Sequence, residues 1–227
     1  MNRRWLIVPA VLVVVVIGII VSMQFSSAPK PDTTQPATSA TGERVAFYGD
    51  SYTLGTGASA EDKRWSTTIS RQRNWQEFNP SVNGLGFINN RTDFNDGDLP
   101  SLVIADKPDI VFITMGLNDN FSYDYSAEAI QQQITLDFTR LKDALPNARF
   151  IVVEPFWYTD DRPPSVDIIS SWVKDAAAAI DADYIPGASH WIEGHPEWMA
   201  DDGLHPNDDG YAAMAVQMDA ALKNLDL

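Results

Sequence analysis

The segment Val45-Ala-Phe-Tyr48-Gly49-Asp50-Ser51 decides the fold, because an apolar, β-rich run leads directly into a turn that carries a serine. The run predicts a buried strand, and the glycine predicts its end. A serine at a strand-to-helix turn presents its hydroxyl above the sheet, with its backbone N–H at a helix start where negative charge is favoured. Alone, the same residues are also typical of an ordinary serine helix N-cap, so a functional role for Ser51 depends on the other motifs of the chain.

Further apolar segments alternate with helical patterns along the chain. The strand-like segments are Ile110–Met115, Phe150–Val153, Tyr184–Ile185 and, more weakly, Phe78–Val82. The helical spacings are Ile130, Ile134, Phe138, Leu141 and Leu145 behind Ser126 as a cap; Ile169, Val173, Ala176 and Ile180 after Pro164-Ser165; and Tyr211, Met214, Met218 and Leu222 after Asn207. This alternation predicts a mostly parallel sheet covered by helices on both faces, a three-layer α/β/α sandwich. In such sheets ligands bind at the carboxyl ends of the strands.

The bulk composition limits the possible functions. The 227 residues are 44% hydrophobic and 21% charged, which suits one globular domain. A net charge of −15 repels phosphate backbones, so we expect no nucleic-acid partner. The chain has no cysteine, which excludes disulfides, thiolate metal sites and cysteine nucleophiles.

The N-terminal sequence predicts a membrane segment. Arg3 and Arg4 precede an uninterrupted apolar run from Leu6 to Val21, which as a helix spans roughly 24 Å of the ~30 Å bilayer core. Arginines before the helix predict a cytoplasmic N-terminus, with the remainder outside the cell membrane. If the segment is cleaved after Ser26-Ser27-Ala28, the protein is secreted instead. We therefore expect an anchor or signal segment over residues 1–25, a Ser/Thr/Pro-rich linker over 26–43 and a folded domain over 44–227.

Two more polar motifs lie beside predicted elements. Gly116-Leu117-Asn118-Asp119 ends the strand Ile110–Met115, and Asp202-Gly203-Leu204-His205-Pro206 precedes the last helix. An aspartate and a histidine three apart on a tight turn allow a carboxylate to contact an imidazole. Each motif alone is most often a simple turn, so only their combination carries an argument.

Together these motifs, in this order, resemble the blocks of the SGNH (GDSL) hydrolase family over most of Arg44–Leu227. The stretch Asn79-Pro-Ser-Val-Asn-Gly84-Leu-Gly86-Phe resembles the family's glycine block, in which an asparagine five residues earlier selects Gly84, with Gly86 as the alternative. Leu204-His205-Pro206-Asn207 followed by Gly210-Tyr211 resembles the family's ending. The resemblance implies a flavodoxin-like sandwich.

The resemblance also implies the role of each residue in the hydrolysis of carboxylic esters. Ser51 attacks the acyl carbonyl, His205 takes the serine proton and Asp202 orients His205. The N–H groups of Ser51 and Gly84 and the side-chain amide of Asn118 hold the oxyanion. This agrees with general chemistry, because a serine hydroxyl needs a base to accept its proton and the oxyanion needs donors fixed in advance.

The implied substrate is a small-molecule or glycan ester, and no metal or organic cofactor is implied. Two alternatives stay open. The same acyl-enzyme can pass its acyl group to a sugar or another alcohol, or the domain can be a catalytically silent surface binding module that has kept the fold.

Three other signals point elsewhere. Gly55-Thr-Gly57-Ala-Ser-Ala60 matches a dinucleotide fingerprint, but six residues separate it from the first strand, whereas that fingerprint must follow its strand directly. His190 and His195 lie near Glu193 and Glu197 without the spacing that puts two imidazoles on one helical face. The chain also lacks a Gly-x-Ser-x-Gly elbow, which argues against an α/β-hydrolase.

Several aromatic residues lie in predicted loops at the same rim, and for them two interpretations stay open. Such side chains can line an acyl or sugar pocket, or they can cover the edge of the sheet. The residues concerned are Phe121, Phe156, Trp157, Tyr158, Trp191 and Trp198.

Overall fold

The computed structural model describes residues 42–93 and 97–227. The expected anchor over 1–25 and nearly all of the expected linker over 26–43 lie outside these residues. Among the helices that are described, none is long and apolar enough to cross a membrane.

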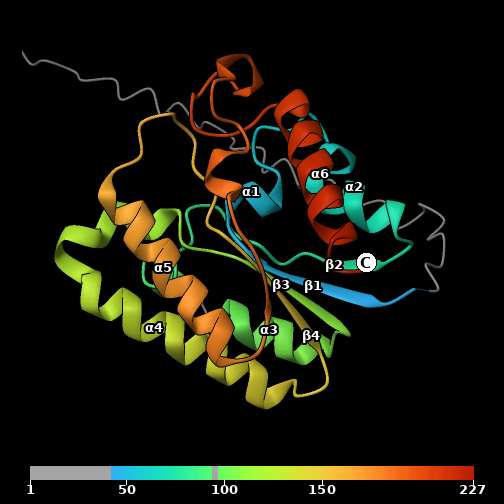
Figure 1. Cartoon of the computed structure of the whole chain (residues 1–227), viewed down its shortest axis with the longest axis vertical. Coiled ribbons are helices and arrows are strands. Elements are labelled where there is room, and N and C mark those ends of the chain that lie inside the picture. The colour runs from blue at the N-terminus through green and yellow to red at the C-terminus, as the bar shows by residue number, and fades with distance from the viewer. Residues whose placement is uncertain (1–41, 94–96) are drawn as a thin grey trace, which may run out of the picture. The chain divides into compact units, whose positions relative to one another are not determined.

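The described residues form one five-stranded sheet, with all neighbouring strands parallel (Figure 1). The strands are β1 (Arg44–Gly49), β2 (Gln76–Phe78), β3 (Ile110–Thr114), β4 (Arg149–Val153) and β5 (Asp183–Ile185), in the spatial order β2-β1-β3-β4-β5. This is the flavodoxin-like order, whose ligand site lies at the switch point between β1 and β3. Gly49 of β1 pairs with Thr114 of β3, so the motifs that follow these two strands lie next to each other.

The helices cover both faces of the sheet (Figure 1). They are α1 (Ser51–Leu54), α2 (Trp65–Gln72), α3 (Leu99–Asp106), α4 (Tyr123–Ala144), α5 (Pro164–Ala179) and α6 (Asp208–Lys223). Along β1, Val45 and Phe47 pack in the core beneath α2 and α6, whereas Ala46 and Tyr48 point into the second core beneath α3, α4 and α5. This alternation follows from the two-residue period of a strand. The predicted three-layer α/β/α sandwich is therefore confirmed.

Short 3-10 helices complete the connections between these elements. They are η1 (Glu61–Lys63), η2 (Arg91–Asp93), η3 (Asn118–Ser122), η4 (Ala188–His190) and η5 (Pro196–Trp198). Three of them, η3, η4 and η5, follow strands β3 and β5 on the way to the next helix, which is where the sequence placed the loops of the site.

Some predicted boundaries were wrong. Ser126 does not cap α4, because η3 leads directly into the helix at Tyr123 and Ser126 lies inside its first turns. The strand expected at Phe78–Val82 lies instead at Gln76–Phe78, and the residues after it form a loop. The side chain of Asn79 holds that loop against α1 by donating to the Thr53 carbonyl at 2.8 Å.

Neither α2 nor α3 was predicted from the sequence. In α2, Trp65 and Ile69 lie four residues apart on one buried face, but two apolar residues are too few to stand out as a helical period. In α3 the apolar residues occur on all sides of a short helix, so no 3.6-residue period exists, although Asp98 caps it and accepts from the Ser101 N–H. The sequence of α2, WSTTISRQ, is rich in β-branched and hydroxyl residues, which are weak helix formers. Packing against α6 stabilises α2 instead.

A charged network is built into the core beneath α4. The carboxylate of Asp137, only 1% exposed, accepts hydrogen bonds from Tyr48 Oη at 2.6 Å and from both Nη atoms of Arg91 at 2.7 Å. Burial, followed by the Asp137 charge, raises the pKa of Tyr48. Arg91 also donates to the Phe87 carbonyl at 3.2 Å, so this network fastens the loop before η2 to α4.

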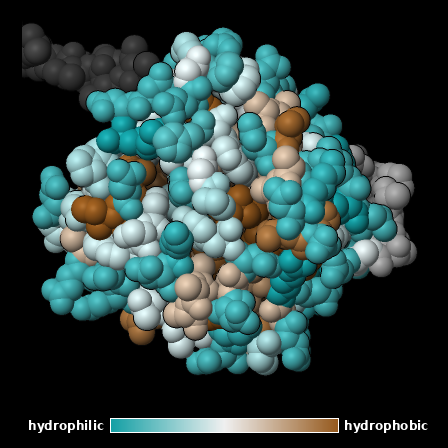
Figure 2. Space-filling model, viewed as in Figure 1, coloured by the Kyte–Doolittle hydropathy of each residue, from teal (hydrophilic) through white to brown (hydrophobic). Residues whose placement is uncertain are grey.

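The surface of the described domain is mostly polar. Figure 2 shows that hydrophilic residues cover most of one face and that apolar residues appear between them in small groups.

Candidate active site

The turn after β1 is built to present Ser51. A Cβ on Gly49 would lie 2.5 Å from the Thr53 side chain and from Thr114 Oγ1, so only glycine allows this close approach to β3. Asp50 caps α1 by accepting the Tyr52 N–H at 3.0 Å. Ser51 is the first residue of the helix and is 3% exposed.

Two backbone N–H groups near this turn are available to a ligand. The N–H groups of Ser51 and Gly84 donate to no group within residues 42–93 and 97–227. The Gly86 N–H, in contrast, donates to the Asn89 carbonyl at 2.9 Å. The hydrogen bonding therefore favours Gly84 over Gly86 as the donor, and Gly84 also has the left-handed φ of +69° that suits glycine.

Asn118 follows β3 and joins these two segments. Its amide nitrogen donates to the Leu85 carbonyl at 3.0 Å and to Asp50 Oδ2 at 3.3 Å, and the side chain is buried. The structure thus brings the serine turn, the Gly84 loop and the Asn118 amide together at the carboxyl ends of β1 and β3.

His205 and Asp202 form a hydrogen-bonded pair in the turn before α6. Asp202 Oδ2 lies 2.7 Å from His205 Nδ1, and Oδ1 accepts the N–H groups of Leu204 and His205 at 2.9 Å each. The bond to the imidazole, followed by the two backbone bonds, lowers the pKa of Asp202 to about 2. Asp202 is therefore an anion at neutral pH, and its position favours the tautomer whose Nε2 can accept a proton.

This turn is fastened to the helix that begins with Ser51. Tyr52 Oη donates to the Leu204 carbonyl at 2.7 Å, next to His205. Gly57 lies against the same turn, because a Cβ there would come within 2.4 Å of the Pro206 carbonyl oxygen and 3.1 Å of His205 Cβ. These contacts assign Gly57 a packing role that a dinucleotide fingerprint does not require.

In the part of the chain that the structure describes, no hydrogen bond connects the Ser51 hydroxyl with the His205 imidazole. Catalytic hydrogen bonds are often long in free enzymes and shorten in the substrate complex. The contacts of Tyr52 and Gly57 nevertheless place both residues on segments that touch.

Two buried carboxyl groups lie beneath the site. Burial raises the pKa of Asp50 to about 7; the Tyr52 N–H bond opposes this rise, and the nearby charge of Asp119 is part of it. Burial also raises the pKa of Asp119, against three backbone N–H bonds that lower it. A carboxylate pair in an apolar environment is costly to charge.

The remaining histidines have separate partners. His190 Nδ1 pairs with Glu193, and His195 Nδ1 lies 2.8 Å from Glu197 while its ring stacks on Trp198. Among residues 42–93 and 97–227, no group of three or more potential ligands is placed to hold a metal ion.

The aromatic residues divide between core and surface. Phe156 and Trp157 are 2% and 3% exposed and pack in the core, as the edge-covering interpretation required. Tyr158 instead lines a groove of about 480 Å³ beside Asp202, and Phe121 is 49% exposed next to it. The groove is also bordered by Asp160, Asp201 and Gly203, among others.

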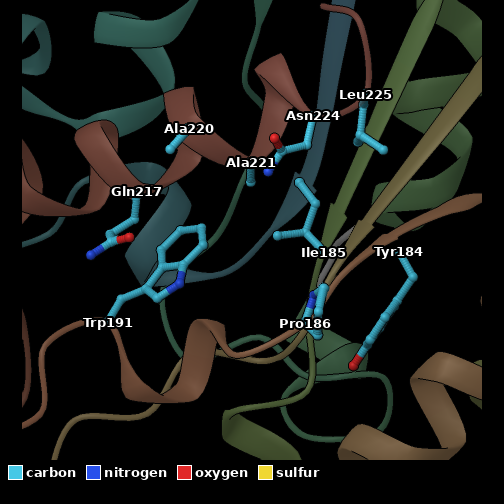
Figure 3. A pocket seen from close by; sticks show the side chains of 9 residues that line it. All are labelled: Tyr184, Ile185, Pro186, Trp191, Gln217, Ala220, Ala221, Asn224 and Leu225. Carbon is cyan, nitrogen blue, oxygen red and sulfur yellow. The ribbon is translucent and has the colours of Figure 1, made fainter.

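A second pocket of about 340 Å³ lies between β5 and the last turns of α6 (Figure 3). Its side chains include Ile185, Trp191 and Ala221, with Gln217 and Asn224 at its polar side. No carboxylate, histidine or serine lines it, so it offers neither a nucleophile nor a base.

The model of the GDSL-like Lipase/Acylhydrolase family matches residues 47–213. The chain belongs to this family. A GDSL lipase of Mycobacterium tuberculosis is 27% identical over 199 residues, which are 81% of this chain and 82% of that lipase. The protein is accordingly a GDSL-type esterase or lipase, a hydrolase, as the sequence motifs predicted.

Solved structures of GDSL-like and related enzymes share the fold. TesA matches with a TM-score of 0.66 at 19% identity, over 80% of this chain and 99% of TesA. The esterase EstA from Pseudoalteromonas sp. matches with a TM-score of 0.62 at 18% identity, over 80% and 97%. The acetylxylan esterase Axe2 from Geobacillus stearothermophilus matches with a TM-score of 0.58 at 18% identity, over 78% and 92%.

Sequence reasoning missed residues that support the site of this GDSL-like enzyme. Tyr52 was not singled out, although its hydroxyl holds the histidine turn. The helical spacing predicts only a buried core position for Tyr211, but its Oη also donates to the Thr56 carbonyl at 2.7 Å. Asp119 was quoted in its motif without a role. A tyrosine next to the serine was the one available signal, because a buried tyrosine hydroxyl needs a hydrogen-bond partner.

Proposed function

We propose that Ser51, His205 and Asp202 form a catalytic triad that hydrolyses carboxylic esters through an acyl-serine, with the oxyanion held by the N–H groups of Ser51 and Gly84 and by the Asn118 amide. The observation that carries this proposal is the Asp202–His205 pair, which is hydrogen-bonded at 2.7 Å and fastened to the helix of Ser51 through Tyr52. The two N–H groups without partners in the described chain support Ser51 and Gly84 as donors. The Asn118 amide would have to exchange its longer bond, 3.3 Å to Asp50 Oδ2, for the oxyanion.

The first half of the reaction acylates the enzyme. Ser51 Oγ attacks the acyl carbon while its proton moves to His205 Nε2, and the carbonyl oxygen becomes an oxyanion. The ionised Asp202 stabilises the imidazolium that forms. As the oxyanion collapses, the bond to the alcohol oxygen breaks and His205 returns its proton to the leaving alcohol.

The second half releases the acid. Water attacks the acyl-serine while His205 takes one of its protons, and the same donors hold the second oxyanion. Collapse then breaks the bond to Ser51 Oγ, which recovers its proton from His205. Each fixed donor contributes roughly 2.7–4 kcal/mol to transition-state stabilisation.

Labelling with a fluorophosphonate ester tests the nucleophile. We expect wild-type protein to be labelled and Ser51→Ala to stay unlabelled and inactive on a short-chain ester. Among the histidines, His205→Ala is expected to abolish turnover, whereas His190→Ala and His195→Ala keep it. Turnover in a folded His205→Ala variant, or its loss in a folded His195→Ala variant, would assign the base elsewhere.

The groove beside Asp202 supports a neutral ester as substrate. Asp160 and Asp201 border it, so an anionic head group would be repelled there, while the Tyr158 ring offers a stacking surface for a sugar. One solved structure with the same fold is an acetylxylan esterase. An ester panel that compares acetylated xylan with a phosphatidylglycerol of short acyl chains tests this, and faster hydrolysis of the anionic lipid would contradict it.

The site of action that we propose is outside the cell membrane, with residues 1–25 as the anchor. The support is in the sequence, where Arg3 and Arg4 precede the apolar run Leu6–Val21. Membrane fractionation and protease treatment of intact cells expressing the full chain test it. Full-length protein that is soluble and protected inside the cell would refute the location without affecting the chemistry.

A further inference from the structure

Asp119 is a buried carboxylate that the proposed catalytic steps do not use. It directly follows Asn118 and has 0% exposure. Its Oδ2 accepts the Phe87 N–H at 2.7 Å, and its Oδ1 accepts the N–H groups of Ile88 and Asn89 at 2.9 and 3.3 Å. All three donors belong to the loop that begins at Gly84.

Gly86 is shaped to admit this carboxylate. A Cβ at residue 86 would lie 2.6 Å from Cγ, Oδ1 and Oδ2 of Asp119, so the carboxylate packs directly against the bare Cα. The two glycines of the block therefore have different tasks. Gly84 keeps an N–H that has no partner among the described residues, whereas Gly86 provides the space through which Asp119 reaches the loop backbone.

The contact continues from Asp119 to Gly84 through Asn89. The Asn89 N–H is held by Asp119, and its side-chain amide donates to the Gly84 carbonyl at 2.9 Å. On the other side, the Asn118 amide donates to the Leu85 carbonyl at 3.0 Å. Asn118 and Asp119 are thus adjacent in η3: the Asn118 amide is one proposed oxyanion donor, and Asp119 anchors the loop that provides another, the Gly84 N–H.

We propose that Asp119 is a positioning residue that holds the Gly84 N–H at a fixed place relative to the Asn118 amide, so that both donors meet the same oxyanion. This inference rests on the proposed function, because it requires Gly84 and Asn118 to be the oxyanion donors. A displacement of about 1 Å in such a site lowers the rate by about 10²-fold, so the anchor affects the chemical step more than substrate binding.

The test compares Asp119→Asn with wild type by kcat and KM per active site, counted by complete labelling with a fluorophosphonate. The amide keeps one acceptor but turns an NH₂ toward a backbone N–H, which loosens the loop. We expect kcat to fall about 10- to 100-fold with KM changed by less than about threefold. A purely structural role would lower the number of labelled sites and leave kcat per site unchanged, which would overturn the proposal.

Glu154→Gln is the matched control. Glu154 accepts the N–H groups of Gly187 and Ser189 at 2.9 and 3.2 Å, so it is also a carboxylate that holds a loop backbone, but after β5. We expect this variant to lose stability without losing kcat per site. An equal fall in kcat for Glu154→Gln and Asp119→Asn would show a general effect of loosened loops and would overturn the proposal.

The double variant Asn89→Ala/Asn90→Gly keeps the test decisive if Asp119→Asn does not fold. The side-chain amides of Asn89 and Asn90 both donate to the Gly84 carbonyl at 2.9 Å, so only the loss of both breaks the link while Asp119 stays in place. Glycine suits position 90, where φ is +53°. We expect kcat to fall about threefold to tenfold at constant KM; unchanged kcat would refute the proposal. Turnover by Ser51→Ala would instead refute the proposed function, so the two failures are distinguishable.

Discussion

Asp50 gives the stability of this enzyme a pH dependence whose size follows from its burial. The carboxyl group is 1% exposed, and desolvation raises its pKa from 3.8 to about 7 in the folded protein. Between these values the unfolded chain releases the proton while the folded chain keeps it. The folded state then binds more protons, so the free energy of unfolding falls as pH rises from about 4 to about 7.

The magnitude follows from the shift. A shift of about 3 pH units at 1.36 kcal/mol each corresponds to about 4 kcal/mol, which is present below pH 4 and lost by about pH 7. The Asp50→Asn substitution removes the titration, and the amide oxygen still accepts the Tyr52 N–H that caps α1. Relative to wild type, the variant should therefore gain about 4 kcal/mol between pH 4 and pH 8.

Urea unfolding followed by tryptophan fluorescence measures this at pH 4, 5, 6, 7 and 8 for both proteins. The relevant quantity is the difference between the two proteins at each pH, because titrating groups that do not interact with Asp50 cancel and only Asp50 and its neighbour Asp119 contribute. Near-UV circular dichroism confirms that the variant keeps the native packing. If the difference stays constant across this range, Asp50 is ionised throughout in the folded state and the reasoning from burial fails.

Three further outcomes follow from the contacts in the structure. Asn118→Ala should lower kcat on a short-chain ester about 10²- to 10³-fold with little change in KM, because it removes a proposed oxyanion donor. A change in KM alone would assign Asn118 to substrate binding. Tyr52→Phe should cost about 1 kcal/mol in urea unfolding and also lower kcat, because it releases the Leu204 carbonyl beside His205; unchanged kcat would show that the turn is held by other contacts. Asp137→Ala should lower the free energy of unfolding by about 1–3 kcal/mol, because it removes the buried acceptor of Tyr48 and Arg91, although Arg91 keeps its ion pair with Asp98 at 2.9 Å. A loss below about 0.5 kcal/mol in the same assay would show that Asp98 and solvent compensate for Asp137.

The sequence was sufficient for the sheet and the main helices, since their signals are local. The segment Val45–Tyr48 is apolar throughout because β1 is buried on both faces, and α5 begins at the expected Pro164. The same locality explains the failures. Helix α3 carries apolar residues on its solvent-facing side as well as on its buried side, so its sequence shows no helical period. The boundary of β2 depends on the contact of Asn79 with α1, which no local sequence pattern shows.

The candidate site was predictable to the level of residue types at strand ends, because the carboxyl ends of parallel strands meet at one edge. Asn118 lies beside the Ser51 turn for this reason, since β3 is the neighbour of β1 and the Asn118 amide reaches Asp50. The sequence favoured Gly84 over Gly86 only through the spacing from Asn79. The physical difference between the two glycines is that the Gly86 N–H already donates to the Asn89 carbonyl, which becomes a neighbour only after the loop folds.

The arrangement of the proposed nucleophile and base depends on contacts between distant parts of the chain. Ser51 belongs to the first helix, whereas His205 precedes the last one, so neither motif can fix the position of the other. Tyr52 crosses this separation with one hydrogen bond to the Leu204 carbonyl, and Gly57 contributes a surface without a side chain against which the histidine turn packs. The motifs around Ser51 and His205 thus indicate which chemistry is available. The position of His205 relative to Ser51, however, depends on Tyr52 and Gly57, which belong to no recognisable catalytic motif. Substitutions at Tyr52 and Gly57 should therefore lower turnover as catalytic substitutions do, through the placement of His205, although neither residue takes part in the proposed reaction.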